Sequence, residues 1–162
     1  MVGGCVEEGP WLPTSHPVAA PDFTLPKIGG GTVTLSALRG QVVVMEFWAT
    51  WCGPCRMSTP SVEAVYRTLK GRGVTALLIN VGEKEEEITR WAGTRFTAAI
   101  LMDQDQDVAR RYGVQGIPTL LVIDQEGRII HRHSGYSGGL EQHLSQALEA
   151  LLQPSAPQEP HG

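Results

Sequence analysis

Two cysteines stand three residues apart in the segment Trp51-Cys52-Gly53-Pro54-Cys55. The segment follows an apolar stretch with strand character and precedes a stretch with helical periodicity, so Cys52 is expected at a helix N-terminus. Free N–H groups and the positive end of the helix dipole stabilise a thiolate there. One helical turn separates the two sulfurs, which is close enough for a disulfide. We therefore expect Cys52 to be an exposed nucleophile of low pKa and Cys55 to be a shielded resolving thiol.

This arrangement indicates thiol–disulfide exchange. Attack by Cys52 on a substrate disulfide gives a mixed disulfide, and Cys55 then displaces the reduced substrate. Pro54 fixes φ near the helix start, where its missing N–H costs nothing. Two other interpretations stay open, namely half of a zinc site and an incidental core pair. The sequence contains no second Cys/His pair at ligand spacing, so no metal site is predicted.

A second element with chemical meaning is Gly116-Ile117-Pro118-Thr119, directly before a predicted strand. A trans proline would merely begin that strand. A cis X–Pro bond costs only about 0.5–1 kcal/mol and would turn a backbone edge toward the cysteines. An extended substrate segment could pair with that edge. Together with the cysteine pair, this favours a cis Pro118 and a substrate-binding surface made of Trp51, Gly53, Pro54, Ile117 and Pro118.

The resolving step also requires Cys55 to lose its proton away from water, so a nearby carboxylate would help. Glu46 lies six residues before Cys52, in the predicted strand Gln41 to Trp48. The residues next to Glu46 on both faces of this strand are apolar. A lone buried carboxylate tends to have a raised pKa. We therefore predict that Glu46 carries the acid–base role. The structural alternative is a glutamate paired with a neighbouring Arg or Lys.

The elements that must position these residues fit in one domain, because the chain has only 162 residues. Hydrophobic residues make up 41% and charged residues 19% of the chain, which is typical of a globular protein. A net charge of −4 with 13 scattered Lys and Arg argues against nucleic-acid binding. No apolar run approaches the roughly 18 residues of a membrane-spanning helix. Three cysteines are too few for a disulfide scaffold.

Hydrophobic patterns predict alternating strands and helices, which indicates an α/β domain with a mixed sheet. The predicted strands cover 41–48, 74–81, 98–102, 119–124 and 128–134, and a small hairpin and turn lie within 23–38. The predicted helices cover 54–70, 83–93, 107–112 and 140–152. We expect a flexible leader over 1–19, the domain over 20–152 and a disordered tail over 153–162. In the leader, Val2-Gly3-Gly4-Cys5 is similar to the end of a bacterial lipoprotein cleavage box, with a free thiol as the alternative.

The stretch FWATWCGPC and the downstream GIPT resemble the thioredoxin superfamily. The segments PDFTL, LSALRG and Asn80-Val81-Gly82-Glu83 are similar to its TlpA/ResA/CcmG branch. The resemblance covers about residues 20–152. It implies a thioredoxin fold with an N-terminal β-hairpin and an inserted strand–helix unit at about residues 83–102. It also implies a cis Pro118 and cycling of Cys52 and Cys55 between dithiol and disulfide. The ResA branch has a glutamate three residues after its second cysteine, where this chain has Ser58, so Ser58 is not expected to carry the acid–base role.

The resemblance further implies a reductase of protein disulfides in the periplasm or elsewhere outside the cytoplasm, tethered through an N-terminal lipid or a removed anchor. Its clients would include an apocytochrome c whose cysteines need reduction before haem attachment, and a membrane thiol reductase would supply electrons. We expect a monomer without a cofactor. Three alternatives stay open: a general thioredoxin-like reductant, a peroxiredoxin and a metal chaperone. The peroxidatic motif Pro-x-x-x-Thr-x-x-Cys does not fit the residues ending at Cys52 or Cys55.

Three further patterns are interpreted as ordinary surface features. The acidic run 103–107 lacks the later residues of a calcium-binding EF-hand loop, and we expect a solvated loop and helix cap. His131 and His133 lie two apart on a strand and are expected at the surface. The run from Glu83 to Glu87 is expected to be a solvated helix face.

Overall fold

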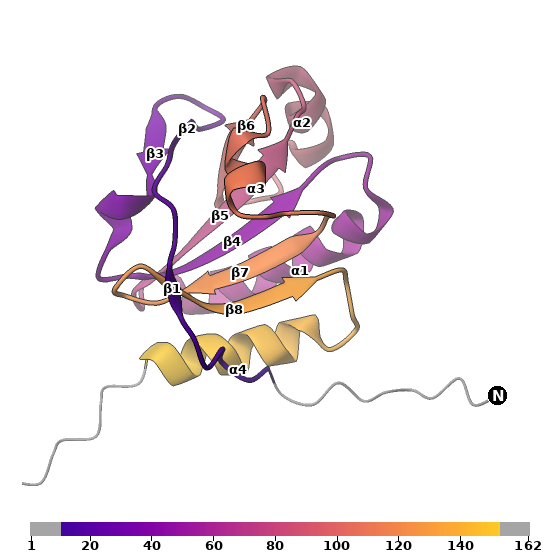
Figure 1. Ribbon diagram of the computed structural model, residues 1–162. Helices are drawn as coiled ribbons and strands as arrows, with labels where there is room; N and C mark the ends of the chain where they lie inside the picture. Colours follow the sequence, from indigo (N-terminus) through magenta and orange to yellow (C-terminus); the bar gives the residue numbers. More distant parts are fainter. Residues whose placement is uncertain (1–10, 153–162) are drawn as a thin grey trace, which may run out of the picture.

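The computed structural model describes residues 11–152, which form a twisted sheet with helices packed on it (Figure 1). The element order confirms the alternation of strands and helices predicted from the sequence. The strands are β1 (Val18–Ala19), β2 (Thr24–Pro26), β3 (Thr32–Thr34), β4 (Val42–Trp48), β5 (Val74–Val81), β6 (Ala99–Asp103), β7 (Thr119–Ile123) and β8 (Arg128–Ser134). The helices are the 3-10 turn Leu35–Leu38, α1 (Gly53–Leu69), α2 (Glu85–Ala92), α3 (Asp107–Arg111) and α4 (Leu140–Leu152).

The main sheet is mixed and has the strand order β1-β8-β7-β4-β5-β6. Strand β4 pairs in parallel with β5 and antiparallel with β7, so it runs through the middle of the sheet. All seven residues of β4 are buried, as its nearly uninterrupted apolar sequence predicts. Because β4 and β5 are parallel, their carboxyl ends meet at one edge of the sheet, and α1 begins there.

Helices cover both faces of this sheet (Figure 1). Helix α1 packs against α4, and both contact β4. Helix α3 contacts β6 and lies in front of the sheet in the view of Figure 1, whereas α1 lies behind it. The predicted insertion is present as α2 and β6, and β6 extends the sheet in parallel beside β5. The observed architecture is the predicted thioredoxin-like fold.

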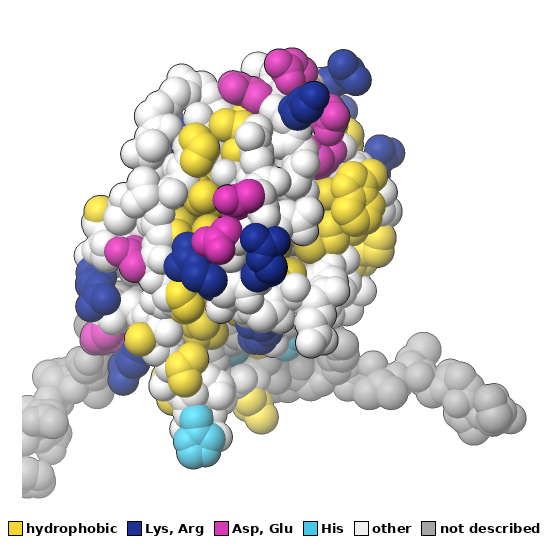
Figure 2. Space-filling model, turned by 45° about the horizontal axis from the view of Figure 1, so that its top comes forward, with side chains coloured by type: hydrophobic (Ala, Val, Ile, Leu, Met, Phe, Trp, Pro, Cys, Tyr) yellow, Lys and Arg dark blue, Asp and Glu magenta, His cyan; other side chains and the backbone are white. Residues whose placement is uncertain are grey.

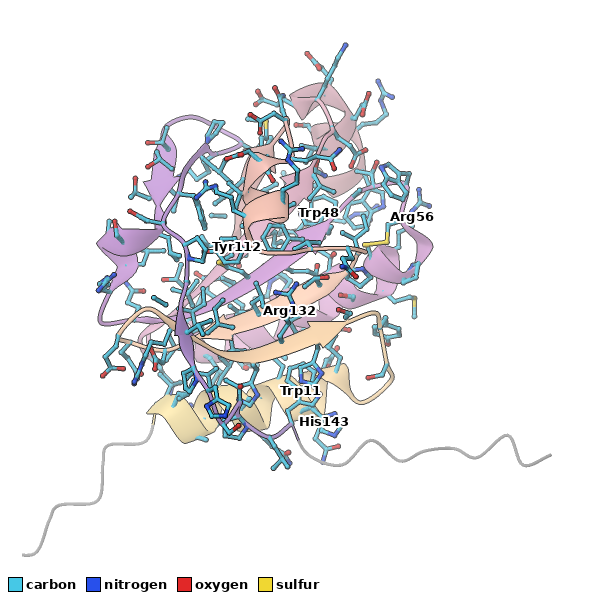
Figure 3. All side chains as sticks on the ribbon, viewed as in Figure 1. Trp11, Trp48, Arg56, Tyr112, Arg132 and His143 are labelled. Atoms are coloured by element: carbon cyan, nitrogen blue, oxygen red, sulfur yellow. A yellow bond between two sulfur atoms is a disulfide. The ribbon has the colours of Figure 1, made fainter. Side chains whose placement is uncertain are left out.

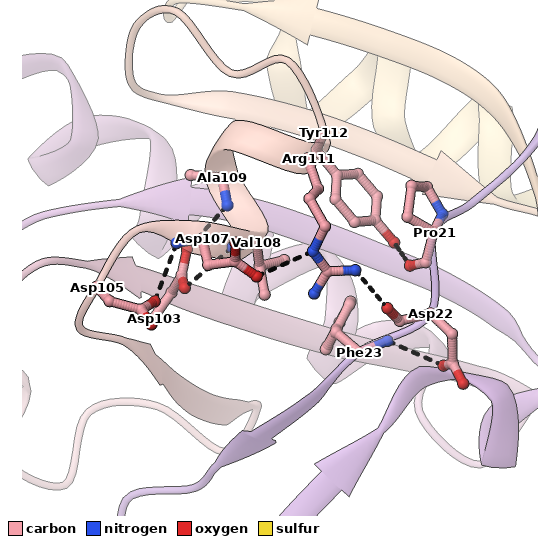
Figure 4. Close-up of polar contacts among 10 residues, drawn as sticks. All are labelled: Pro21, Asp22, Phe23, Asp103, Asp105, Asp107, Val108, Ala109, Arg111 and Tyr112. Carbon is pink, nitrogen blue, oxygen red and sulfur yellow. Dashed lines mark hydrogen bonds and ion pairs between the residues drawn. The ribbon is translucent and has the colours of Figure 1, made fainter.

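The β2–β3 hairpin forms a separate two-stranded sheet. The segment before it is held by two polar side chains at the end of α3, those of Arg111 and the following Tyr112 (Figure 4). The Tyr112 hydroxyl donates to the carbonyl of Pro21 at 2.5 Å, and Arg111 donates to the carbonyl of Asp22 at 2.7 Å. At the other end of α3, the buried carboxylate of Asp103 accepts from the backbone of Val108 and Ala109. The acidic run therefore contains a helix cap, as expected. No group of three potential metal-ligating side chains occurs within residues 11–152.

Part of the predicted leader, residues 11–19, is among the described residues and contacts the domain. Val18 and Ala19 form β1, which pairs with β8. Before it, the Trp11 ring stacks on His133 with a centroid distance of 3.7 Å, and Trp11 lies beside α4 (Figure 3). The predicted surface position of His131 is wrong, since only 5% of this residue is exposed. Desolvation by burial lowers the pKa of His131. Cys5 and the tail 153–162 lie outside the described residues.

Candidate active site

Helix α1 begins at the cysteine pair, as the sequence predicts. Cys52 is the N-cap residue, and its Sγ accepts a hydrogen bond from the backbone N–H of Cys55 at 3.2 Å. The two cysteines are joined in a disulfide with a Cα–Cα distance of 5.2 Å (Figure 3). Pro54 lies in the first turn of the helix, where no N–H is needed. In the reduced state, the same helix end would place backbone donors around the Cys52 sulfur.

The structure corrects the expected exposure of Cys52. Only 4% of Cys52 is exposed in the disulfide form, compared with 0% of Cys55. The loop before β7 lies against Cys52, since the Ile117 carbonyl oxygen is 3.6 Å from the Cys52 sulfur. The predicted order of accessibility is kept, but the margin is small. A client must therefore reach the small part of Cys52 that is exposed between α1 and this loop.

The loop before β7 has the backbone that the sequence favours. The Ile117–Pro118 peptide bond is cis. The Thr119 hydroxyl donates to the Gly116 carbonyl at 2.6 Å, and the Gly135 N–H donates to the Pro118 carbonyl. These hydrogen bonds hold the loop next to the cysteines. Residues 116 and 117 are at least partly exposed, so a neighbouring chain can reach this loop.

Two exposed apolar side chains lie close to the cysteine pair in sequence. Trp51 is 69% exposed and Met57 is 57% exposed, although both side chains are large and hydrophobic. Figure 2 shows apolar side chains gathered on the flank where α1 begins, while acidic side chains gather elsewhere. A groove of about 270 Å³ runs between Trp51 and the Gly116–Ile117 edge. Exposed apolar surface of this kind is typical of a site that binds another molecule.

Glu46 lies on β4 beneath α1 and is completely buried. Its two carboxylate oxygens accept hydrogen bonds from the hydroxyls of Ser58 and Thr59. Among the described side chains, both hydrogen-bond partners of the Glu46 carboxylate are therefore hydroxyls, and no Arg or Lys pairs with it. Desolvation raises the pKa of Glu46 to about 7, from 4.5, although the two hydroxyls oppose the shift. The group can therefore exchange a proton near neutral pH.

Ser58 binds this carboxylate from α1, the helix that begins at the cysteine pair. Ser58 stands three residues after Cys55, one turn along α1, and is buried. It does not replace the missing glutamate as an acid, since its hydroxyl donates to Glu46. A carboxylate at the Ser58 position would place two acids in contact. This chain thus has a buried acid, Glu46, on β4 and a serine, Ser58, at the α1 position where the ResA branch has a glutamate.

The raised pKa of Glu46 predicts a pH-dependent stability. Between pH 4.5 and about 7 the folded protein binds more protons than the unfolded chain, so the free energy of unfolding falls as pH rises. A shift of this size corresponds to about 3 kcal/mol by pH 8. Glu46→Gln should remove most of this fall and be the more stable protein at pH 8. Urea unfolding of both proteins at pH 5 and pH 8 measures the difference, and parallel pH profiles would contradict the assignment.

Glu83 is a site residue that sequence reasoning placed wrongly. It is 6% exposed rather than part of a solvated helix face, and α2 begins only at Glu85. Its carboxylate bonds to Thr50, two residues before Cys52. The remainder of the acidic run, 84–87, is exposed as expected. The signal available in the sequence was the position of Glu83 two residues after the end of a predicted buried strand.

A mixed sheet with a disulfide at the start of α1 and a cis proline facing it defines a protein of the thioredoxin superfamily. Residues 18–132 match the AhpC/TSA family. The chain belongs to this family.

Relatives and solved structures agree with this placement. The chain is 37% identical over 112 residues to the thiol-disulfide oxidoreductase ResA of Geobacillus thermodenitrificans, covering 68% of this chain and 64% of the relative. It thus spans less than two thirds of that relative. It is 32% identical over 140 residues to the ResA protein of Halalkalibacterium halodurans, covering 85% of this chain and 77% of the relative.

Two solved structures have the same fold. A Chlorobium tepidum protein described as a thiol:disulfide interchange protein DsbE superposes with a TM-score of 0.79 and 33% identity, covering 85% of this chain and 97% of that one. The exposed lipoprotein thioredoxin of Streptococcus pneumoniae superposes with a TM-score of 0.70 and 28% identity, covering 81% and 100% of the two chains. Within residues 11–152, no helix is long and apolar enough to cross a membrane.

Proposed function

We propose that this protein is a thiol–disulfide oxidoreductase that reduces disulfides in client proteins. The single observation that carries the proposal is the Cys52–Cys55 disulfide at the start of α1, facing the cis Ile117–Pro118 bond. The names of the ResA and DsbE relatives support the same activity. The Gly53-Pro54 dipeptide is that of reducing thioredoxins, which favours reduction over oxidation of clients.

The reaction begins from the dithiol. The Cys52 thiolate attacks one sulfur of the client disulfide, forms a mixed disulfide and releases the other client sulfur as a thiolate. Cys55 then gives up its proton, and its thiolate attacks the Cys52 sulfur. The bond between Cys52 and the client breaks, and the second client sulfur leaves. Two electrons pass to the client, whose sulfurs take up protons, and the protein ends as the Cys52–Cys55 disulfide.

Glu46 is proposed to accept the proton of Cys55. Cys55 is fully buried, so water does not reach its sulfur freely. Glu46 contacts Ser58 one turn further along α1, and its pKa of about 7 lets it hold or release a proton under ordinary conditions. A base matched to the operating pH is the most effective one for such a transfer.

The client is proposed to lie across Trp51 and the edge of residues 116 and 117. The exposed indole and the groove beside it offer apolar contact, and an extended segment could lie along the partly exposed loop at residues 116 and 117. The side chains lining this groove are uncharged; they are Trp51, Val81, Gln106, Ala109, Val114, Gln115 and Ile117. A client segment with uncharged residues next to its disulfide fits this surface.

The place of action is proposed to be outside the cytoplasm, with an apocytochrome c among the clients and a membrane thiol reductase as the source of electrons. Support comes from the resemblance to the ResA and CcmG branch and from the lipoprotein among the solved neighbours. The Val2-Gly3-Gly4-Cys5 pattern is consistent with a lipid tether.

The test is turnover of a protein disulfide, compared with the rival activities. The reduced full-length protein should reduce insulin disulfides catalytically with dithiothreitol as electron source. Peroxide consumption and stoichiometric copper retention are measured on the same sample. Insulin reduction without peroxide consumption and without stoichiometric copper retention supports the proposal. Failure to reduce insulin, or peroxide consumption at a comparable rate, would reject it in favour of the peroxidase or the metal chaperone.

A further inference from the structure

A second buried carboxylate, distinct from Glu46, bonds to Thr50, which lies two residues before Cys52. Glu83 follows β5 at the edge of the sheet where α1 begins, and 6% of the residue is exposed. A buried carboxylate is costly unless hydrogen bonds satisfy its oxygens. The identity of its donors therefore indicates what the residue is for.

Both oxygens of Glu83 bind one residue of the loop that leads to Cys52. The Thr50 backbone N–H donates to Oε1 at 2.6 Å, and the Thr50 hydroxyl donates to Oε2. This bidentate contact joins residues 33 positions apart in the chain. Two hydrogen bonds from one residue to the two oxygens of one carboxylate fix both the position and the orientation of Thr50.

Asn80 orients the Glu83 carboxylate from the last part of β5. Its side-chain amide donates to Oε1 at 2.8 Å, while its carbonyl oxygen accepts from the Glu83 backbone N–H at 3.2 Å. In the parallel register Asn80 lies opposite Trp48, the last residue of β4. The sheet itself therefore places the Asn80–Glu83 pair beside the loop that leaves β4.

The third polar group of Thr50, its backbone carbonyl, is held by a different element. This carbonyl accepts from the Arg56 guanidinium at 3.0 Å, and Arg56 is part of α1. Thr50 is thus fixed between the end of β5 and the first turn of α1. Two residues later the chain reaches Cys52, whose N–H donates to the Ala49 carbonyl. A shift of Thr50 would be transmitted to the N-cap sulfur through only two residues.

We propose that Glu83 is a positioning residue, which holds the Cys52 sulfur at the N-terminus of α1 through its bidentate hydrogen bonds to Thr50. The inference rests on the proposed thiol–disulfide exchange, in which Cys52 is the nucleophile. Glu83 takes no proton and touches no reacting atom in this role. Its loss releases the loop, so the thiolate gains less from the helix N-terminus and meets the client disulfide in a poorer geometry. Misplacement of about 1 Å can cost on the order of 100-fold in rate.

The experiment measures Cys52 itself rather than turnover alone. Reduced full-length protein is alkylated with iodoacetamide across pH 5–9, and modification of Cys52 is followed by mass spectrometry. For Glu83→Ala we expect about tenfold slower alkylation at pH 7 and a pH midpoint shifted upward. Glu83→Gln can still accept from the Thr50 N–H and should stay within about threefold of wild type. The matched control is Glu86→Ala, an exposed glutamate on α2, which should leave the profile unchanged.

Each outcome decides the proposal. A folded Glu83→Ala protein with the wild-type pH profile would overturn it, as would a Glu83→Gln protein as slow as Glu83→Ala. If Glu83→Ala does not fold, Thr50→Val removes only the hydroxyl arm and should slow alkylation about twofold to threefold, while a wild-type rate would reject the role. Failure of the wild-type protein to reduce insulin would reject the proposed function instead, and the alkylation comparison would still test the positioning.

Discussion

Replacing Cys52 by serine should abolish disulfide reduction, with a loss on the order of 1,000-fold or more in insulin turnover. A serine hydroxyl is not ionised near neutral pH, so it cannot attack a client disulfide from the start of α1. Cys55 cannot substitute, because it is fully buried behind the N-cap residue. The measurement is the initial rate of insulin reduction with dithiothreitol present, corrected for the rate without protein.

Cys55→Ala is the companion variant, and it separates the two cysteine roles. It keeps the nucleophile but lacks the resolving thiol, so it should accumulate a mixed disulfide with the client on Cys52. Cys5→Ser serves as the control for the third cysteine and should behave as wild type. A Cys52→Ser protein that retains turnover, or a Cys55→Ala protein that captures clients through another cysteine, would contradict the assigned roles. Applied to an extract of the native cell, the same trap identifies the client.

Replacing Glu46 by glutamine should have the second largest effect, a fall of about tenfold to a hundredfold in client reduction near pH 7. In the wild-type protein the ionised carboxylate accepts the proton of Cys55, so the rate should rise with pH through about 7, where the group titrates. Glutamine fills the same space and can bond to Ser58 and Thr59, but it accepts no proton. The variant should lose both the rate and this inflection. Stopped-flow reduction of a client disulfide by the dithiol protein, from pH 5.5 to pH 8.5, measures both.

The matched control for Glu46 of β4 is a second buried glutamate, Glu63, which lies on α1. Glu63 accepts hydrogen bonds from Thr97 and the backbone of Ala98 and pairs with Arg67, so its role is structural. Glu63→Gln should lower stability without changing the pH profile of client reduction. If Glu46→Gln retains the wild-type rate and inflection, Cys55 loses its proton to another group and the acid–base role is wrong.

The sequence was sufficient to predict the redox pair and the succession of strands and helices along the chain, since both depend on local pattern. The cis Pro118 was favoured only together with the cysteine pair and the resemblance to a known family. Cys52 and Cys55 are three residues apart, and the signals for the strand before them and the helix after them are strong. Pro118 is distant in sequence, yet its place before a strand and its resemblance to a known motif favoured the observed isomer. Glu46 was identified because an acid inside an otherwise apolar strand is rare.

The remaining features depend on tertiary contacts that no local pattern carries. Glu83 belongs to a charged run that is typical of a solvated surface. Only the parallel register of β4 and β5 brings it to Thr50. The burial of Cys52 depends on the Ile117 loop, which is 65 residues away in the chain. Similarly, Trp11 stacks on His133 of β8, so a proline-rich segment that was expected to be mobile covers part of the domain.

The most direct test of the central claim is the acidity of the Cys52 thiol in the reduced wild-type protein. Alkylation of Cys52 is followed site by site across the pH range, with Cys5 and Cys55 as internal references. The account predicts a midpoint clearly below 8.5, the ordinary value for cysteine, together with formation of the Cys52–Cys55 disulfide on mild oxidation. A midpoint at or above 8.5, or an oxidised protein in which the two cysteines are not linked, would contradict it.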